Sequence, residues 1–169
     1  MSTSQLVRRL LAAGFQDYES YRELRRQILF RSDAAEIILA DLEFRRKSIT
    51  KLNAMQSLEI SHLLMLLKHV AKPQYEPRVS SLLDWRLIVL DPACRTNKCL
   101  VVEILGAIGT EQTAWASKRF QVAVRSTVYS SVHWGNSHTP NPYKRDQFDC
   151  EQAIAACLGR KNPEPSSAA

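Results

Sequence analysis

Hydrophobic residues in the first part of the chain recur with the period of an α-helix. Tyr21, Leu24 and Ile28 are separated by three and four positions, and charged residues occupy the remaining faces. Ser32, which is followed by an aspartate, is typical of an N-cap, and it predicts a second helix that runs to about Lys47. The pattern therefore predicts separate helices rather than one continuous coiled coil.

A third predicted helix is rich in leucine. We expect the chain to break after Ser48 and a new helix to start with Ser57 as its N-cap, extending to about Lys72. Apolar positions are so dense along this helix that we expect it to form the centre of the hydrophobic core. They include Ile60, Leu63, Leu64, Leu67 and Val70.

The pattern changes in the second half of the chain. Residues 85–90 and 99–108 are rich in Val, Ile and Leu, which predicts two buried strands. Residues 120–132 alternate as in a strand but also carry an apolar stripe at i, i+4 spacing, so strand and helix both remain open, with the strand favoured. Residues 146–158 are expected to form a last helix, because an aspartate precedes it and a glycine follows it.

Together these elements predict an α+β fold. Its helical N-terminal half contains three to four helices and is followed by a small sheet and one C-terminal helix. Two prolines predict a linker at residues 73–80, between a helical region at 1–72 and a small α/β region at 81–160. Residues 161–169 form a polar tail.

The first sixteen residues have the character of a mitochondrial import segment. No acidic residue precedes Asp17, and Arg8 and Arg9 lie off the apolar face of the projected helix. An ordinary first helix that packs on the core has the same pattern, so both interpretations stay open. We therefore expect an intracellular protein, either mitochondrial or cytoplasmic. The apolar face comprises Leu6, Val7, Leu10, Leu11 and Phe15.

Composition narrows the class of protein. Hydrophobic residues make up 45% of the chain, which allows a buried core, but the apolar runs are far shorter than the roughly 20 residues that cross a bilayer. We therefore expect no membrane span. The cysteines are expected to be reduced, because the N-terminus lacks the apolar region of a secretory signal. A formal net charge of +6 favours anionic partners such as nucleic acid or an acidic protein surface.

Pairs of basic residues on three predicted helices form a candidate nucleic-acid-binding surface. If these helices pack side by side, their guanidinium groups meet on one face that can bind phosphates. The alternative is a solvated face, where carboxylates at i, i+4 spacing neutralise the same charges. RNA or DNA binding is therefore kept as an alternative function. The candidate residues are Arg8, Arg9, Arg25, Arg26, Arg45, Arg46 and Lys47.

An aromatic and basic segment in the second half is a candidate partner-binding site. It contains Trp134 and Tyr143, followed by Lys144 and Arg145. Tryptophan, tyrosine and arginine dominate the energetics of protein interfaces, which favours a protein partner at this loop. A tryptophan packed against the edge of the domain is the alternative.

Two Cys and two His form a weak candidate for a zinc site. Cys94 and Cys99 are separated by four residues, as are His133 and His138, which is close to the spacing of structural zinc ligands. The chain contains no C-x-x-C knuckle, and isolated cysteines of this kind are more often small buried hydrophobic residues.

Evidence for catalysis is sparse. Asp91 and Glu103 could hold a divalent metal, but the nuclease pattern places a lysine two residues after the glutamate, where this chain has Leu105. His62 and His69 share a helix face, as packed or rim histidines often do. The chain has no phosphate-binding glycine loop or hydrolase elbow. We therefore expect a non-catalytic protein-interaction subunit of a larger assembly, with a nucleic-acid-binding protein as the alternative and a metal-dependent enzyme as a minor one.

Overall fold

The computed structural model describes residues 1–13, 17–85, 95–110 and 155–156. Within these ranges the chain forms six α-helices and two short 3-10 helices, and it contains no β-strand. None of the described helices combines the length and the apolar character needed to cross a bilayer. The elements are α1 (Thr3–Ala13), α2 (Tyr18–Leu29), α3 (Ala34–Ser48), α4 (Ala54–Val70), η1 (Pro73–Tyr75), α5 (Glu76–Ser81), η2 (Leu82–Asp84) and α7 (Arg95–Ile108).

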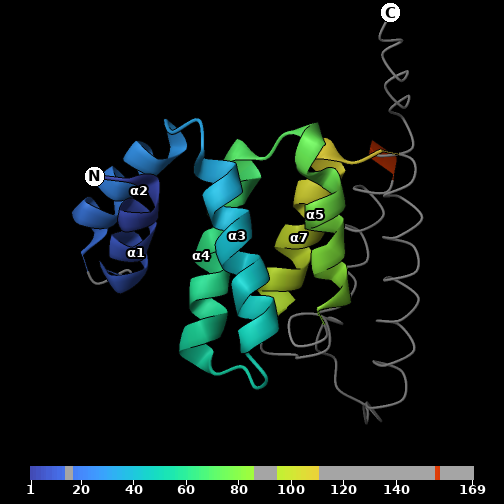
Figure 1. Ribbon diagram of the computed structural model, residues 1–169, viewed down its shortest axis with the longest axis horizontal. Helices are drawn as coiled ribbons and strands as arrows, with labels where there is room; N and C mark the ends of the chain where they lie inside the picture. Colours follow the sequence, from blue (N-terminus) through green and yellow to red (C-terminus); the bar gives the residue numbers. More distant parts are fainter. Residues whose placement is uncertain (14–16, 86–94, 111–154, 157–169) are drawn as a thin grey trace, which may run out of the picture.

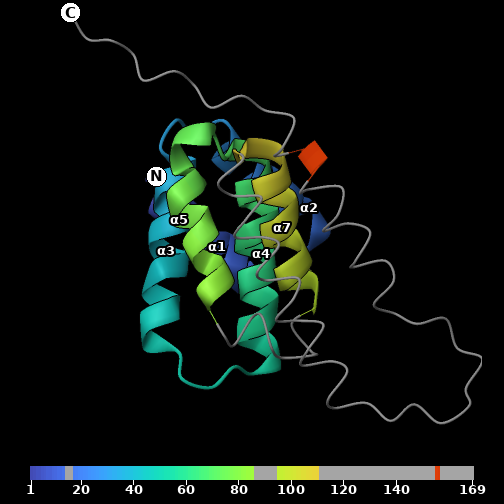
Figure 2. The ribbon, with the colours of Figure 1, turned by 90° about the vertical axis from the view of Figure 1, so that its right-hand side faces the viewer.

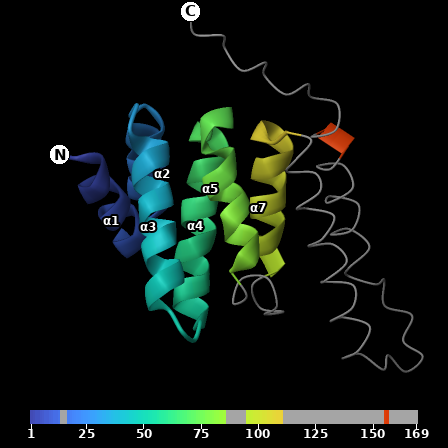
Figure 3. The same ribbon diagram turned by 45° about the vertical axis from the view of Figure 1, so that its right-hand side comes forward.

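The helices stand side by side in two layers. α1 packs against α2 and α3, and α2 packs against α4, so the first two helix pairs are neighbours (Figure 1). α4 also packs against α7, which in turn contacts α5, so a third pair continues the row (Figure 3). In the view along the row, α1, α3 and α5 form one layer and α2, α4 and α7 form the other (Figure 2). Stacked helix pairs of this kind are typical of α-helical solenoids.

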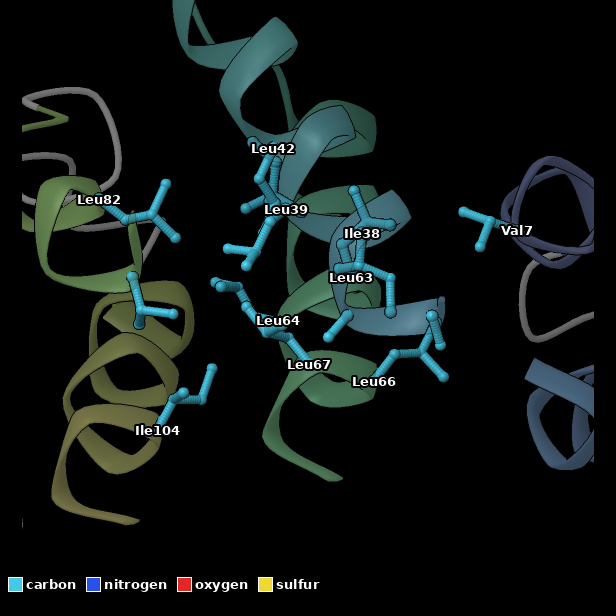
Figure 4. Close-up of a cluster of buried hydrophobic side chains, with 14 of the residues drawn as sticks. Val7, Ile38, Leu39, Leu42, Leu63, Leu64, Leu66, Leu67, Leu82 and Ile104 are labelled. Carbon is cyan, nitrogen blue, oxygen red and sulfur yellow. The ribbon is translucent and has the colours of Figure 1, made fainter. Parts of the chain in front are cut away.

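The middle pair, α3 and α4, forms the centre of the core. Leu66 of α4 extends toward the side where Val7 of α1 lies, and Leu64 extends the opposite way, toward Ile104 of α7 (Figure 4). The predicted central helix is thus confirmed, because Ile60, Leu63, Leu64 and Leu67 are all fully buried. A helix that is covered on two sides needs a wide apolar surface, which explains its density of leucine.

Side-chain caps set the starts of two helices. Asp17 accepts a hydrogen bond from the backbone N–H of Ser20 at the start of α2. At the start of α4, Asn53 accepts from the N–H of Gln56 over 2.8 Å, and the Gln56 side chain accepts from the N–H of Asn53 over 3.1 Å. This reciprocal pair is a capping box, so the prediction that Ser57 caps the helix is wrong by one turn.

Residues 73–80, predicted as a linker, are helical. Pro73 and Pro77 stand in the first turns of η1 and α5, where a helix does not require the N–H that proline lacks. Val79 on α5 is fully buried in the common core. The two prolines therefore mark the starts of helices as well as the end of α4.

Arg78 links α5 to α3. Its Nε and Nη2 donate to the two carboxylate oxygens of Glu43 over 2.7 and 2.9 Å, and its Nη1 donates to Glu36 over 2.7 Å. The hydrogen bonds from Arg78 hold the pKa of Glu43 below its usual value. One guanidinium group therefore pairs with two carboxylates of α3, the neighbouring helix in the same layer.

The predicted strand at residues 99–108 is wrong, because these residues belong to α7. Val101, Val102, Ile104, Leu105 and Ile108 are buried, a spacing that places them on one side of a helix packed against α4 and α5. A dense run of β-branched residues fits a buried helix as well as a buried strand, and here packing between helices decided the outcome. The predicted α+β fold with a small sheet is therefore incorrect, and the described part of the chain is helical.

Other predictions of the second half fall outside the described residues. Of the expected strand at 85–90, only Trp85 is described, and it is buried directly after η2. The ambiguous segment at 120–132 and the polar tail at 161–169 are not described. Of the expected helix at 146–158, the structure describes residues 155–156 alone.

The apolar face of α1 is part of the core. Leu6 and Leu10 are completely buried, Val7 is nearly so, and the helix packs against α2 and α3. Arg8 and Arg9 are exposed, as expected from the helical projection. α1 therefore has a structural role in the folded protein. If residues 1–16 also act as an import segment, they serve both roles.

Candidate interaction surface

The structure does not gather the predicted nucleic-acid-binding residues on one surface. Arg45 points from α3 toward α4, where its Nε donates to Asp41 over 3.1 Å and its Nη1 donates to Glu59 over 2.5 Å. Arg46 instead donates to the backbone oxygen of Ser81 over 2.7 Å. These two guanidinium groups therefore hold α3 against its neighbours and are largely occupied within the fold.

The other candidates lie on separate helices. Arg8 and Arg9 are exposed on α1, and Lys47 is exposed at the end of α3. Arg26 on α2 forms an exposed ion pair with Glu23 at 3.0 Å. The Arg26 side chain remains accessible to solvent in this pair. Exposed pairs of this type contribute little to stability.

Most of the remaining candidates lie outside the described residues. Cys99 falls within α7, and Glu103, which was considered as a metal ligand on a strand, also lies on this helix. Among the residues that the structure describes, no group of three or more His, Cys, Asp and Glu side chains is placed to hold a metal ion. The candidates outside the described ranges are Asp91, Cys94, His133, Trp134, His138, Tyr143, Lys144 and Arg145.

A hollow of about 390 Å³ lies where α2, α4 and α7 meet, and it was not predicted. It is lined mainly by apolar atoms, with cationic groups beside them. Tyr21 and Arg25 contribute from α2, Met65 and His69 from α4, and Leu100 from α7.

Two apolar side chains at the start of α4 are also accessible on the face that carries Met65 and His69, with the buried His62 between them and the hollow. Met55 is 65% exposed and Leu58 is 40% exposed, although both lie on the helix that forms the centre of the core. Residues separated by three and four positions share one face of a helix, and this face leads from the start of α4 into the hollow. We call the hollow together with this face of α4 the α2–α4 groove. The residues on its α4 side are Met55, Leu58, His62, Met65 and His69.

Two contacts between α2 and α4 form the wall of the groove. The rings of Tyr21 and His62 meet edge to face, with their centroids 5.3 Å apart. Arg25 Nη2 and His69 Nε2 are 2.9 Å apart. Arg25 follows Tyr21 in α2, and its partner His69 follows His62 in α4, so the two helices run in the same direction.

Both histidines of the groove are disfavoured as cations. Burial lowers the pKa of His62 below its ordinary value, and the nearby Glu59 offsets this effect in part. The pKa of His69 is lowered by burial and also by the positive charges of Arg25 and Lys68. A neutral His69 accepts a hydrogen bond from Arg25, which matches the observed distance.

The groove carries a surplus of positive charge. Lys68 of α4 is paired with Glu103 of α7 at 2.6 Å. Arg25 of α2 also lines the hollow, and it has no carboxylate within ion-pair distance among the described residues. The rim of an apolar groove is therefore cationic.

The accessible apolar side chains on this face of α4 were not predicted, although the sequence contained a signal for them. His62 and His69 share this face, and Met55, Leu58 and Met65 occupy it at helical spacing. Their exposure could not be foreseen, because a helix at the centre of a core is expected to be covered on every side.

Comparison of the sequence with protein-family models and with curated proteins, and of the structure with solved structures, gave no significant match.

Proposed function

We propose that this protein is a non-catalytic interaction subunit of a larger protein assembly. The observation that carries the proposal is the α2–α4 groove, where large apolar side chains remain accessible beside a well-packed core. Met55 is 65% exposed, whereas Leu63 and Leu66 on the same helix are almost completely buried. Exposed apolar surface of this kind marks interaction sites in folded proteins, because its burial by a partner is favourable.

The arrangement of the helices supports the same function. Stacked helix pairs form an extended surface on each layer, and proteins of this architecture commonly use one layer to bind partners. The layer of α2, α4 and α7 bears the groove. Since fold alone does not specify function, the proposal depends on the groove and not on the helical architecture.

A mitochondrial assembly remains part of this proposal. α1 carries exposed Arg8 and Arg9 on one side and a buried apolar face on the other. The support comes from the acid-free, basic and amphipathic character of the segment before Asp17.

Binding to nucleic acid is the alternative function. Its support is the exposed basic side chains of α1 and α2, including Arg8, Arg9 and Arg22. Phosphate contacts by such residues give binding that falls steeply as salt concentration rises. Arg45 and Arg46 contribute less to this alternative than expected, because both are engaged within the fold.

Purification from native cells under mild conditions, with and without nuclease, tests the proposal. The expected result is a stable, nuclease-resistant complex in which other proteins are present in fixed ratio to this chain. Recovery of the protein alone would contradict the proposal. Recovery with RNA or with nuclease-sensitive partners would favour the nucleic-acid alternative.

A further inference from the structure

The length of the α2–α4 groove matches a short helix. From Met55 to His69 the face of α4 spans 14 residue steps, or roughly 21 Å at the rise of an α-helix. Met55, Leu58 and Met65 are the apolar side chains of this face, and the buried His62 lies between Leu58 and Met65. His69 with Arg25 stands at the far end. A helix of about four turns would cover this distance.

The chemistry of the groove favours a helix over an extended strand. An added strand needs an open sheet edge, and the described part of the chain provides helices alone. Recognition there must use side chains, as in the binding of an amphipathic helix to an apolar groove. Met55 and Met65 fit this mode, because the flexible thioether chain of methionine adapts to the side chains of a partner.

The charge of the groove specifies the partner further. Arg25 has no carboxylate partner among the described residues, whereas Lys68 is paired with Glu103. Acidic residues of a bound helix would supply the missing negative charge at this end. Acidic residues stabilise a helix when they lie in its first turn, and the C-terminal end of α4 favours a neighbouring helix N-terminus.

We propose that the α2–α4 groove binds one amphipathic helix of a protein partner, which runs antiparallel to α4 and carries acidic residues in its first turn. The proposal rests on the proposed function of an interaction subunit. It adds the chemistry and the direction of the segment that is bound.

A designed peptide of about 14 residues tests this chemistry. The probe carries leucines on one helical face and glutamates in its first turn, and two comparison peptides carry lysines in the first turn or the glutamates in the last turn. Fluorescence anisotropy with the full-length protein measures the three dissociation constants. We expect the first peptide to bind at least about tenfold more tightly than either comparison peptide, which corresponds to about 1.4 kcal/mol.

Substitutions in the protein connect this preference to the groove. Arg25→Glu is expected to reverse it, so that the lysine peptide binds more tightly than the glutamate peptide. Arg26→Glu is the matched control, because the adjacent Arg26 is exposed and pairs with Glu23 instead of contacting α4. Met65→Ser should weaken every peptide, whereas Phe44→Ser, at an exposed position of α3, should weaken none.

The proposal is overturned if the glutamate peptide does not bind, or if it binds equally to wild type and to Arg25→Glu. Tighter binding of a single-stranded RNA oligonucleotide than of the peptide, lost in Arg25→Glu, would also overturn it. Purification of the native complex distinguishes a failure of the groove proposal from a failure of the proposed function. A nuclease-resistant complex that survives Arg25→Glu and Met65→Ser rejects the groove but keeps the interaction subunit, whereas a solitary wild-type protein rejects both.

Discussion

Asn97 of α7 and Ser61 of α4 share a hydrogen bond inside the interface between the two helices. The Ser61 hydroxyl donates to Asn97 Oδ1 over 2.5 Å, and the Asn97 side chain is completely buried. Asn97 Nδ2 donates in turn to the backbone oxygen of Ser57 over 3.1 Å. A buried amide must find such partners, and these are available at one register of α7 against α4.

Replacement of Asn97 should therefore destabilise the protein. Asn97→Asp keeps an acceptor for Ser61 but removes the donor to Ser57 and buries a charge, so we expect the free energy of unfolding to fall by about 2 kcal/mol or more at neutral pH. Asn53→Asp is the control, since Asn and Asp are equally good N-caps and Asn53 is exposed. Urea unfolding followed by circular dichroism measures both. Equal stability of the two variants would show that the network does not hold α7.

Arg45 should contribute more to stability than an exposed arginine. It bridges Asp41 and Glu59 with its side chain only 17% exposed, so Arg45→Met leaves two carboxylates close together and partly shielded from water. We expect a loss of about 1–2 kcal/mol, between the values typical of exposed and buried ion pairs. Arg26→Met, which breaks an exposed pair, should leave the unfolding curve unchanged. A similar shift for both variants in urea titrations would contradict this difference.

The two histidines of the groove predict a dependence of stability on pH. Their pKa values in the folded protein are lowered, mainly by burial, so the unfolded chain binds more protons as the solution becomes acidic. This contribution to stability is complete above the ordinary pKa of about 6.5 and is lost as the pH falls through the folded pKa values. Melting temperatures measured between about pH 5 and 8 should decrease toward acid.

The double substitution His62→Gln and His69→Gln separates the histidines from other groups. It should flatten the melting temperature over this range, because glutamine does not titrate. Glu43 also has a lowered pKa, but its stabilising effect is lost at lower pH, below its ordinary value of about 4.5. An unchanged slope in the double variant would assign the pH dependence to other groups.

Substitutions on the two faces of α1 should have different effects on stability. Leu10 is completely buried, so Leu10→Ala should lower the free energy of unfolding by about 2–5 kcal/mol. Arg8 and Arg9 are exposed, and their replacement by Glu should leave the melting temperature nearly unchanged.

The same pair of arginines tests the mitochondrial destination without unfolding the protein. If α1 also acts as an import segment, a fluorescent fusion with Arg8→Glu and Arg9→Glu should remain in the cytosol, because import segments require positive charge. Microscopy of cells that express the wild-type and doubly substituted fusions provides the comparison. Delivery of both fusions to mitochondria would reject α1 as the address.

The helices of the first half could be predicted because their signal is local. The spacing of Tyr21, Leu24 and Ile28 predicted a buried face of α2, and all three side chains are buried. Helix starts were less predictable, because several polar residues compete as N-caps. The capping box of Asn53 with Gln56 was chosen over Ser57, since two reciprocal hydrogen bonds satisfy more backbone groups than one.

The structure of α7 could not be decided from its apolar run. Val101, Val102 and Ile104 favour a strand by propensity, but their burial against α4 and α5 is compatible with a helix. A strand at this place would need a neighbouring strand to satisfy its backbone, and its neighbours in the described structure are helices. The environment therefore overrode the local preference.

By itself, the sequence determined that this part of the chain forms separate helices and that α4 is central, but not the residue at which each helix begins. Helical periodicity and the hydrophobic effect act on short stretches of chain. The tertiary structure decided that residues 95–108 are helical, that Glu59 neutralises Arg45, and that Arg25 remains beside an open apolar groove. These outcomes depend on which helix faces meet. Contacts between residues far apart in the chain are set by the packing of whole helices, which no short sequence pattern contains.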